Sequence, residues 1–322
     1  MSATIAAESV AAVLGGAPLL RSEGRAFPVE VSYLTRAPNE GQGEHVDRAV
    51  RGALADSVGD VLVFLPGQAE IRQAEQLLRD GPSLPGVEVT PLYGDLTLDQ
   101  QEAAIRPAPK GSQKVVLATS IAESSITIEG ITTVVDCGLA RRTRFEPRRG
   151  MDELVTEEAS RASSDQRCGR AGRLRPGHCV RLWAEAAHRQ RCAFDPPELT
   201  RCDMAPIALM LAAWGASDPK ELRLLDPIDR DSLEQGRTLL RKLGALDRRN
   251  VTTSHGDAIA KLGVHPRLAH MMLRAKDRHL GTLGARLAVV LSEKDPFGRR
   301  EVGSDLELRL RWFDDLGGQT TS

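Results

Sequence analysis

The stretch Lys114-Val-Val-Leu-Ala-Thr-Ser-Ile-Ala-Glu-Ser-Ser-Ile-Thr-Ile-Glu-Gly130 decides the fold class of this 322-residue chain. Residues 114–119 (KVVLAT) contain an unbroken apolar run from Val115 to Ala118, which is typical of a buried strand in a parallel sheet. Ligands of such sheets bind at the carboxyl ends of the strands. Small hydroxyl side chains gather there and can bond phosphate or ribose without adding charge: Thr119, Ser120, Ser124, Ser125 and Thr127. An ordinary helix N-cap is the alternative, but it explains one hydroxyl and not five.

The same alternation of strands and helices extends outward from this stretch. Apolar runs predict further strands at 61–65, 87–92 and 131–136, and amphipathic patterns predict helices at 68–78 and 99–105. Alternating strands and helices favour an α/β parallel sheet. From about residue 184 helices dominate, at 204–214, 230–243 and 256–262, with a small β-wing after 246. That order is the order of a winged helix, and an all-helical piece follows at 267–291.

A second stretch, Gln166-Arg-Cys-Gly-Arg-Ala-Gly-Arg173, carries the strongest chemical signal. On a helix, Arg170 and Arg173 lie near one face. Two guanidinium groups on a rigid element suit a transferring phosphoryl group, because they stabilise its charge in the transition state. Gln166 can position the attacking water. The alternative is an arginine-rich helix that faces only solvent.

Composition narrows the class of protein without identifying it. The 43 Lys and Arg residues nearly balance 44 Asp and Glu residues, so no overall basic excess points to nucleic acid. Residues 141–191, however, hold 13 Arg against 7 acidic residues. The five cysteines form no CxxC pair and the chain starts without a secretory signal. We therefore expect the protein to be located in the reducing cytoplasm. The longest apolar run, 207–214, is too short to span a membrane.

Taken together, the motifs resemble the second RecA-like domain of a DEAH-box superfamily 2 helicase. Gln166–Arg173 matches motif VI of that family (Q-R-x-G-R-x-G-R), and residues 118–130 resemble motif V, with Ser120 and Glu129 in the usual Asn and Asp places. Val61–Ile71 resembles motif IV, Pro91-Leu-Tyr-Gly94 the following strand end, and Met1-Ser-Ala-Thr4 motif III (S-A-T).

Downstream segments resemble the winged-helix and ratchet regions of DEAH-box helicases, most closely those of the bacterial HrpB subfamily. They are Pro196–Asp203, Ala212–Gly215, Leu224–Pro227, Leu243–Asp247, His265–Leu268 and Leu291–Pro296. The resemblance predicts four regions: a remnant of the first RecA-like domain with a linker at 1–26, the second RecA-like domain at 27–183, a winged helix at 184–264, and the start of a helical ratchet domain at 265–322.

The resemblance also implies roles for the residues that match the motifs. Arg170 and Arg173 become arginine fingers, and Gln166 orients the hydrolytic water. Thr127 and Glu129 face the ribose and nearby polar groups of the nucleotide. Ile105 stands where relatives place an aromatic against adenine, so apolar packing replaces stacking and base selectivity should be weak.

Further residues are implied to touch nucleic acid or to couple the two motor domains. Thr119 and Ser125 contact the sugar–phosphate backbone of RNA, and Ser2 and Thr4 belong to the coupling motif III. A hairpin beside the nucleic acid contains Arg141, Arg142 and Arg144. Their phosphate contacts predict sequence-independent, salt-sensitive binding. A solvated basic hairpin is the alternative.

The sequence lacks two motifs that the family's chemistry requires, G-x-x-x-x-G-K-[ST] and D-E-x-H. We therefore expect a C-terminal fragment of an ATP-dependent RNA helicase, with DNA left open as substrate. The Mg²⁺ ligands of its ATP site would lie on the missing first RecA-like domain, and the isolated chain would be inactive. Two non-enzymatic classes stay open: a nucleic-acid-binding module and a protein-interaction module derived from a helicase.

Overall fold

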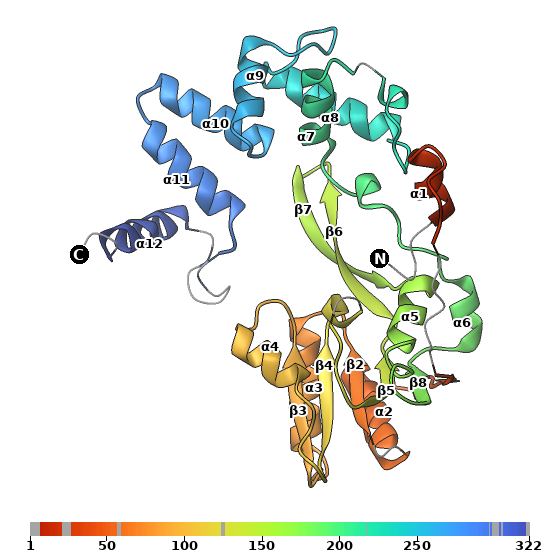
Figure 1. Ribbon diagram of the computed structural model, residues 1–322. Helices are drawn as coiled ribbons and strands as arrows, with labels where there is room; N and C mark the ends of the chain where they lie inside the picture. The colour runs from red at the N-terminus through yellow and green to blue at the C-terminus, as the bar shows by residue number, and fades with distance from the viewer. Residues whose placement is uncertain are drawn as a thin grey trace. The chain divides into compact units, whose positions relative to one another are not determined.

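The computed structural model describes residues 7–20, 27–56, 59–123, 126–216, 218–295, 297, 303 and 305–319. The chain forms two compact units, which we describe separately (Figure 1). The first unit contains Met1–Glu146 and Asp152–Pro197, and the second contains Pro147–Met151 and Glu198–Ser322. The domain limits predicted at 183/184 and 264/265 stay predictions. In the described ranges no helix is long and apolar enough to cross a bilayer.

The first unit is built on one sheet of six parallel strands. Their order across the sheet is β1-β8-β5-β2-β4-β3. The strands are β1 (Val29–Tyr33), β2 (Asp60–Phe64), β3 (Val87–Leu92), β4 (Gln113–Ala118), β5 (Ile131–Asp136) and β8 (Gly177–Arg181). Their last residues pair across the sheet in one row: Leu92, Ala118, Phe64, Asp136, Arg181 and Tyr33. The segments that follow these strands therefore start from a common edge, which confirms the predicted α/β class.

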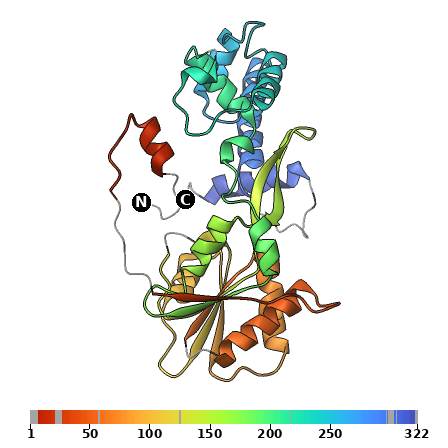
Figure 2. The ribbon, with the colours of Figure 1, turned by 90° about the vertical axis from the view of Figure 1, so that its right-hand side faces the viewer.

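Helices cover both faces of this sheet (Figure 2). Because successive side chains of a strand point to opposite faces, Val61 and Val63 of β2 pack with α2 (Gln42–Asp56) and α3 (Gln68–Asp80). Leu62 and Phe64 pack with α4 (Leu98–Ile105) and α5 (Arg161–Cys168) on the other face. Burial on both faces explains why β2 and β4 read as unbroken apolar runs.

A two-stranded hairpin and two helices also belong to the first unit. The strands β6 (Leu139–Glu146) and β7 (Met151–Glu158) form a separate two-stranded sheet, the hairpin expected to contain Arg141, Arg142 and Arg144. Helix α1 (Ala7–Val13) precedes β1 along the chain, and α6 (Glu185–Gln190) follows β8. The tip of the hairpin, Pro147–Met151, belongs to the second unit.

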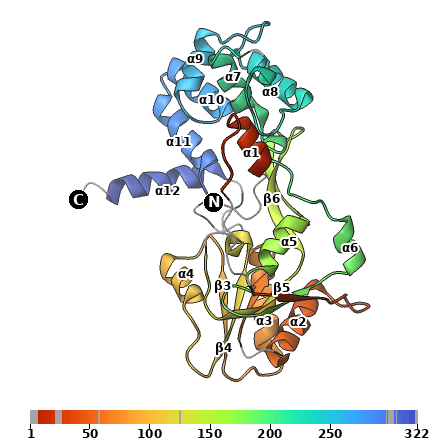
Figure 3. The ribbon, with the colours of Figure 1, turned by 45° about the vertical axis from the view of Figure 1, so that its right-hand side comes forward.

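The second unit is helical (Figure 3). Its helices are α7 (Met204–Ala213), α8 (Arg230–Lys242), α9 (Ser254–Lys261), α10 (Pro266–Asp277), α11 (Gly281–Ser292) and α12 (Leu306–Gln319). Helix α7 packs against α8, α9 and α10 around a common apolar core, and α10 packs against α11. The wing expected after residue 246 is reduced to a single antiparallel bridge between Leu246 and Thr252.

One polar link joins two helix starts in this unit. Asp203 caps α7 by accepting from the Ala205 N–H at 2.8 Å, and it also accepts from His265 Nε2 at 3.0 Å. His265 in turn caps α10, because its Nδ1 accepts from the Arg267 N–H. Burial raises the pKa of Asp203, but the bonds from His265 and Ala205 outweigh that effect and leave the pKa below its ordinary value.

Candidate functional site

The three residues predicted to hold the nucleotide line one cavity between the C-terminal end of α4 and the segment that leads into β5. Ile105 ends α4, whereas Thr127 and Glu129 lie in the segment that follows β4. Together with Glu102, Arg106 and Pro107 they line about 340 Å³. The cavity thus offers an apolar surface from Ile105 and Pro107 beside a hydroxyl and charged groups. That combination fits a nucleoside, whose base is flat and whose ribose is polar.

A buried lysine holds the wall of this cavity that contains Ile105. Lys114 is only 2% exposed, and its Nζ donates to the carbonyl oxygens of Ala103 at 3.0 Å and Arg106 at 2.5 Å. It therefore bonds carbonyls at the C-terminal end of α4, which have no partner within the helix. No role was predicted for Lys114 from the sequence. The available signal was a charged residue at the start of an otherwise apolar strand.

The two predicted arginine fingers lie beside the same segment. The Arg170 guanidinium donates to the carbonyl oxygens of Ile126, at 3.1 Å, and of Glu123. Arg173 Nη1 donates to Thr127 Oγ1 at 2.5 Å. Burial, together with the charge of Arg173, lowers the pKa of Arg170 from its ordinary value. Arg173 is exposed, so its free guanidinium edge faces solvent next to the nucleotide cavity.

The prediction that Arg170 and Arg173 lie on a helix is wrong, because the helix is shorter than expected. Helix α5 ends at Cys168, so half-buried Gln166 is helical while both fingers lie in the turns that follow. The helix ends with Gly169 as its C-cap, and further along another segment approaches closely at Gly172. A Cβ there would lie 2.5 Å from the Phe27 carbonyl oxygen, a position that only glycine can take.

Arg167, the first arginine of the same motif, is the buried centre of an ion network. It is 1% exposed and pairs with Glu123 at 2.6 Å and with Asp136 at 2.8 Å. Its guanidinium also lies 5.2 Å from the ring centroid of Phe64. Burial lowers the pKa of Arg167, but Asp136 and Glu123 outweigh it and raise the pKa above its ordinary value. Arg167 thus ties the segment after β4 to β5 and to α5.

The predicted nucleic-acid residues divide into two groups. Thr119 directly follows β4, is partly exposed, and its hydroxyl has no hydrogen-bond partner within the described part of the chain. The hairpin arginines are engaged instead: Arg141 pairs with Glu70 at 2.9 Å, Arg142 with Asp195 at 2.6 Å and Glu157 at 3.3 Å, and Arg144 with Glu153 at 2.8 Å. Ser125, Ser2 and Thr4 lie outside the described residues.

These ion pairs change the expected charge of the hairpin. Acidic residues on β7 face the arginines of β6, so the hairpin is not the uncompensated basic surface that its first strand suggests. Arg149 in the turn is exposed and has no ion pair among the residues whose positions are described. It is a cation in this hairpin that a phosphate can bind without breaking an ion pair.

Comparison with known proteins shows the same relationship along nearly the whole chain. Residues 44–175 match the family model described as "Helicase conserved C-terminal domain". The chain is 40% identical over 305 residues to the ATP-dependent RNA helicase HrpB of Escherichia coli, and 35% identical over 299 residues to the Schizosaccharomyces pombe pre-mRNA-splicing factor ATP-dependent RNA helicase prp22. These matches cover 94% and 90% of the chain, but only 37% and 25% of the two relatives.

Solved structures lead to the same family. The structure of the E. coli DExH-box NTPase HrpB is 40% identical with a TM-score of 0.88, and the match covers 96% of this chain and 38% of that one. A second structure, of the Escherichia coli DEAH/RHA helicase HrpB, has the same identity and TM-score over 97% of this chain and 39% of that one.

Proposed function

Because the chain corresponds to the C-terminal portion of the DEAH-box helicases related to HrpB, we propose that it forms one wall of an NTP-hydrolysing site that drives movement along RNA. In this proposal Arg170 and Arg173 face the γ-phosphate, and Thr127, Glu129 and Ile105 hold the nucleoside. Gln166 orients the attacking water. A further RecA-like domain would supply the phosphate cradle and the carboxylates that bind Mg²⁺.

The observation that carries the proposal is the hydrogen bond between Arg173 and Thr127. It joins the predicted finger to the predicted nucleoside cavity, two features found from separate stretches of sequence. The terminal phosphate of a bound nucleotide carries negative charge that must be compensated. A guanidinium held at the edge of the nucleoside cavity supplies positive charge for that purpose. Arg170 donates to two carbonyls, so a phosphate would replace at least one of these bonds.

Bound ATP with Mg²⁺ would supply the phosphoanhydride that is cleaved. The residues of this chain fit only the base and the ribose of that nucleotide. Ile105 and Pro107 offer apolar contact to a base, and Thr127 offers a hydroxyl to the ribose. The fingers stabilise charge only when the phosphates are held in place. We therefore expect negligible ATPase activity from the 322-residue chain alone.

An ATPase assay of the purified chain, with and without RNA, tests this expectation. The expected result is turnover indistinguishable from that of the Arg170→Ala variant. Robust turnover that Arg170→Ala abolishes would show that the chain holds a complete site, and the half-site proposal would be wrong.

We propose RNA as the nucleic-acid partner, and we propose Thr119 after β4 and Arg149 in the hairpin turn, each considered by itself, as contacts to its phosphates. Fluorescence anisotropy of a labelled single-stranded RNA should show binding that weakens as salt rises, because phosphate contacts release counterions. Arg149→Glu should weaken it, whereas Arg189→Glu, a change at an exposed α6 residue paired with Glu185, should not. RNA affinity that is independent of salt and of Arg149 would contradict this assignment.

The remaining assignments are proposals as well. We propose that the second unit consists of a winged helix up to residue 264 and the start of a ratchet domain from residue 265. We also propose a reducing cytoplasm as the location, supported by five free cysteines of which Cys137, Cys168 and Cys179 are buried.

A further inference from the structure

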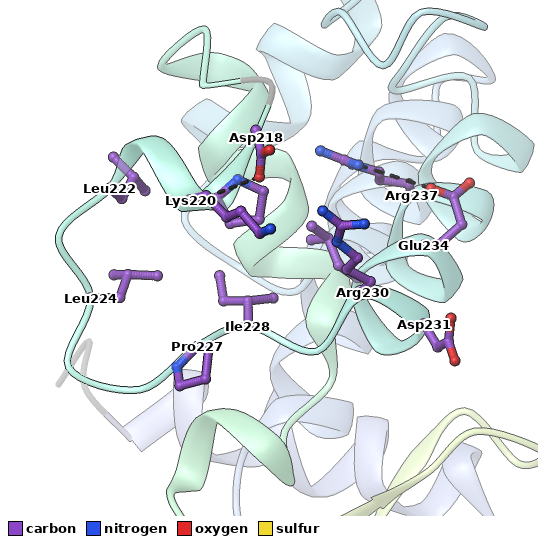
Figure 4. Close-up of a pocket in the computed structure, with 12 residues that line it drawn as sticks. Asp218, Lys220, Leu222, Leu224, Pro227, Ile228, Arg230, Asp231, Glu234 and Arg237 are labelled. Carbon is purple, nitrogen blue, oxygen red and sulfur yellow. Dashed lines mark hydrogen bonds and ion pairs between the residues drawn. The ribbon is translucent and has the colours of Figure 1, made fainter.

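The second unit contains a cavity of about 710 Å³ that the nucleotide and RNA proposals do not use. It lies between the 3-10 turn Pro219–Glu221, the loop 222–229 and the first two turns of α8 (Figure 4). The loop includes Leu224-Leu-Asp-Pro227, a segment that resembles the downstream signatures of DEAH-box helicases. The volume is within the range of cavities that bind ligands.

One side of the cavity is aliphatic. Leu222, Leu224, Pro227 and Ile228 gather there, and Figure 4 shows them together on the loop side of the labelled set. Leu224 is 39% exposed, although leucine is a residue that proteins usually bury. The wall therefore exposes apolar surface to water, and a bound partner would cover that surface.

Two cations stand between this wall and α8. In Figure 4 the side chains of Lys220 and Arg230 extend toward the same central space. Neither side chain has an ion pair or hydrogen bond within the described ranges. The lining therefore combines aliphatic surface with two positive charges that lack a counter-charge.

The acidic residues of the cavity do not supply that counter-charge. Asp218 accepts from the Lys220 main-chain N–H at 3.0 Å, which is a capping bond and leaves the ammonium group unpaired. Glu234 pairs with Arg241 at 2.5 Å and with Arg237 at 4.0 Å. Asp231 and Glu234 lie on the side of the cavity away from Leu222 and Leu224 (Figure 4).

We propose that this cavity binds an extended segment of a partner protein that carries an acidic side chain next to a large aliphatic one. The acidic group would pair with Lys220 and Arg230, and the aliphatic group would cover Leu222 and Leu224. Such charge complementarity sets specificity, while the apolar contact adds affinity. Single-stranded RNA fits less well, because no aromatic side chain lines the cavity to stack a base.

Selection from a phage-displayed library of random short peptides against the full chain tests the proposal. We expect enrichment of peptides with Asp or Glu beside Leu, Ile, Met or Val. Fluorescein-labelled synthetic copies should bind the Lys220→Glu/Arg230→Glu variant about tenfold more weakly or worse, because two attractive contacts become repulsive. Leu224→Ser should weaken binding too.

A matched variant, Lys261→Glu/Arg278→Glu, changes two other exposed cations of the same unit and should bind the peptides unchanged. Unfolding temperatures of all variants check that each one is folded, and Lys220→Gln/Arg230→Gln replaces the charge reversal if that variant unfolds. The proposal is wrong if no peptides are enriched, if enriched peptides lack the pattern, or if both double variants weaken binding equally. If no peptides are enriched and Lys220→Glu/Arg230→Glu instead loses binding to oligouridine, the cavity is a nucleic-acid surface and the proposal is also wrong. None of these outcomes depends on the nucleotide site, because every residue involved belongs to the second unit.

Discussion

Replacing Arg167 by methionine tests the ion network beneath the candidate site. Methionine fills much of the same space but removes the pairs with Glu123 and Asp136. It also removes the bond to the Leu139 carbonyl at 3.1 Å. Asp136 has no exposed surface, so its carboxylate would stay buried without its ionic partner.

The expected loss of stability is large for a single substitution. Breaking a buried ion pair by removing one partner costs about 3–5 kcal/mol. In a domain of this size class each kcal/mol lowers the unfolding temperature by about 2–4 °C, so we expect a decrease of about 6–20 °C for the first unit. An exposed ion pair contributes only about 0–1 kcal/mol.

The assay needs a signal from the first unit alone. Trp183 is 8% exposed and belongs to that unit, whereas Trp214 and Trp312 belong to the second. In a Trp214→Phe/Trp312→Phe background, tryptophan fluorescence during urea or thermal unfolding reports the free energy of unfolding around Trp183. Arg167→Met is then compared with the unsubstituted arginine in the same background.

Two control variants separate the buried charge from other effects. Arg106→Met removes an exposed pair with Glu102, in which the arginine is 74% exposed, and should cost less than about 1 kcal/mol. Adding Asp136→Asn to Arg167→Met removes the unpaired charge and should recover at least about 1 kcal/mol. A loss below about 1 kcal/mol for Arg167→Met, equal to the exposed control, would refute this view of the network.

Three further predictions follow from other features of the chain. Gly172→Ala should cost about 1–3 kcal/mol in unfolding free energy by forcing its neighbours apart, whereas Gly94→Ala, with nothing within 4 Å, should be nearly neutral; equal effects would contradict the crowding at Gly172. Asp203→Asn should destabilise the second unit by about 1–2 kcal/mol at neutral pH. Because the folded pKa of Asp203 is depressed, its contribution is present above the ordinary pKa and lost as pH falls through the folded pKa, so urea titrations should converge in acid. Ile105→Phe, in a form of the protein that hydrolyses NTPs, should raise the preference for ATP over UTP by about 2–10-fold through ring stacking; an unchanged ratio would remove Ile105 from the base site.

Four of the six strands of the parallel sheet were predictable from their apolar residues, and the clearest are β2 and β4, whose side chains are buried on both faces. The predicted limits of β3 and β5 agree with the structure, and those of β2 and β4 differ by one residue. Strand β1 is different: its burial is partial and it contains Glu30 and Ser32 among apolar residues. The edge strand β3 is also partly buried and contains Glu88, but it includes one more apolar residue pair, Pro91 and Leu92, of which Leu92 is fully buried.

Residues named from two separate stretches of the sequence come together in the structure, although their roles stay predictions. Ile105, Thr127 and Glu129 do line one cavity. The partners of Arg167 were not predictable, because Glu123 and Asp136 meet it only through the order of strands in the sheet. The pairing of Arg144 with Glu153 was missed for a similar reason, since cross-strand partners depend on the register of the hairpin.

We propose that Arg170 and Arg173 complete an NTPase site whose phosphate cradle and Mg²⁺ ligands belong to another RecA-like domain. The most direct measurement is the RNA-stimulated ATPase rate of a chimera in which this chain replaces the region that it matches in E. coli HrpB. We predict a chimera that hydrolyses ATP and loses at least about 100-fold in rate with Arg170→Ala, as expected for a lost transition-state charge, while Arg189→Ala leaves the rate unchanged. An active chimera whose rate does not depend on Arg170 or Arg173 would contradict the claim.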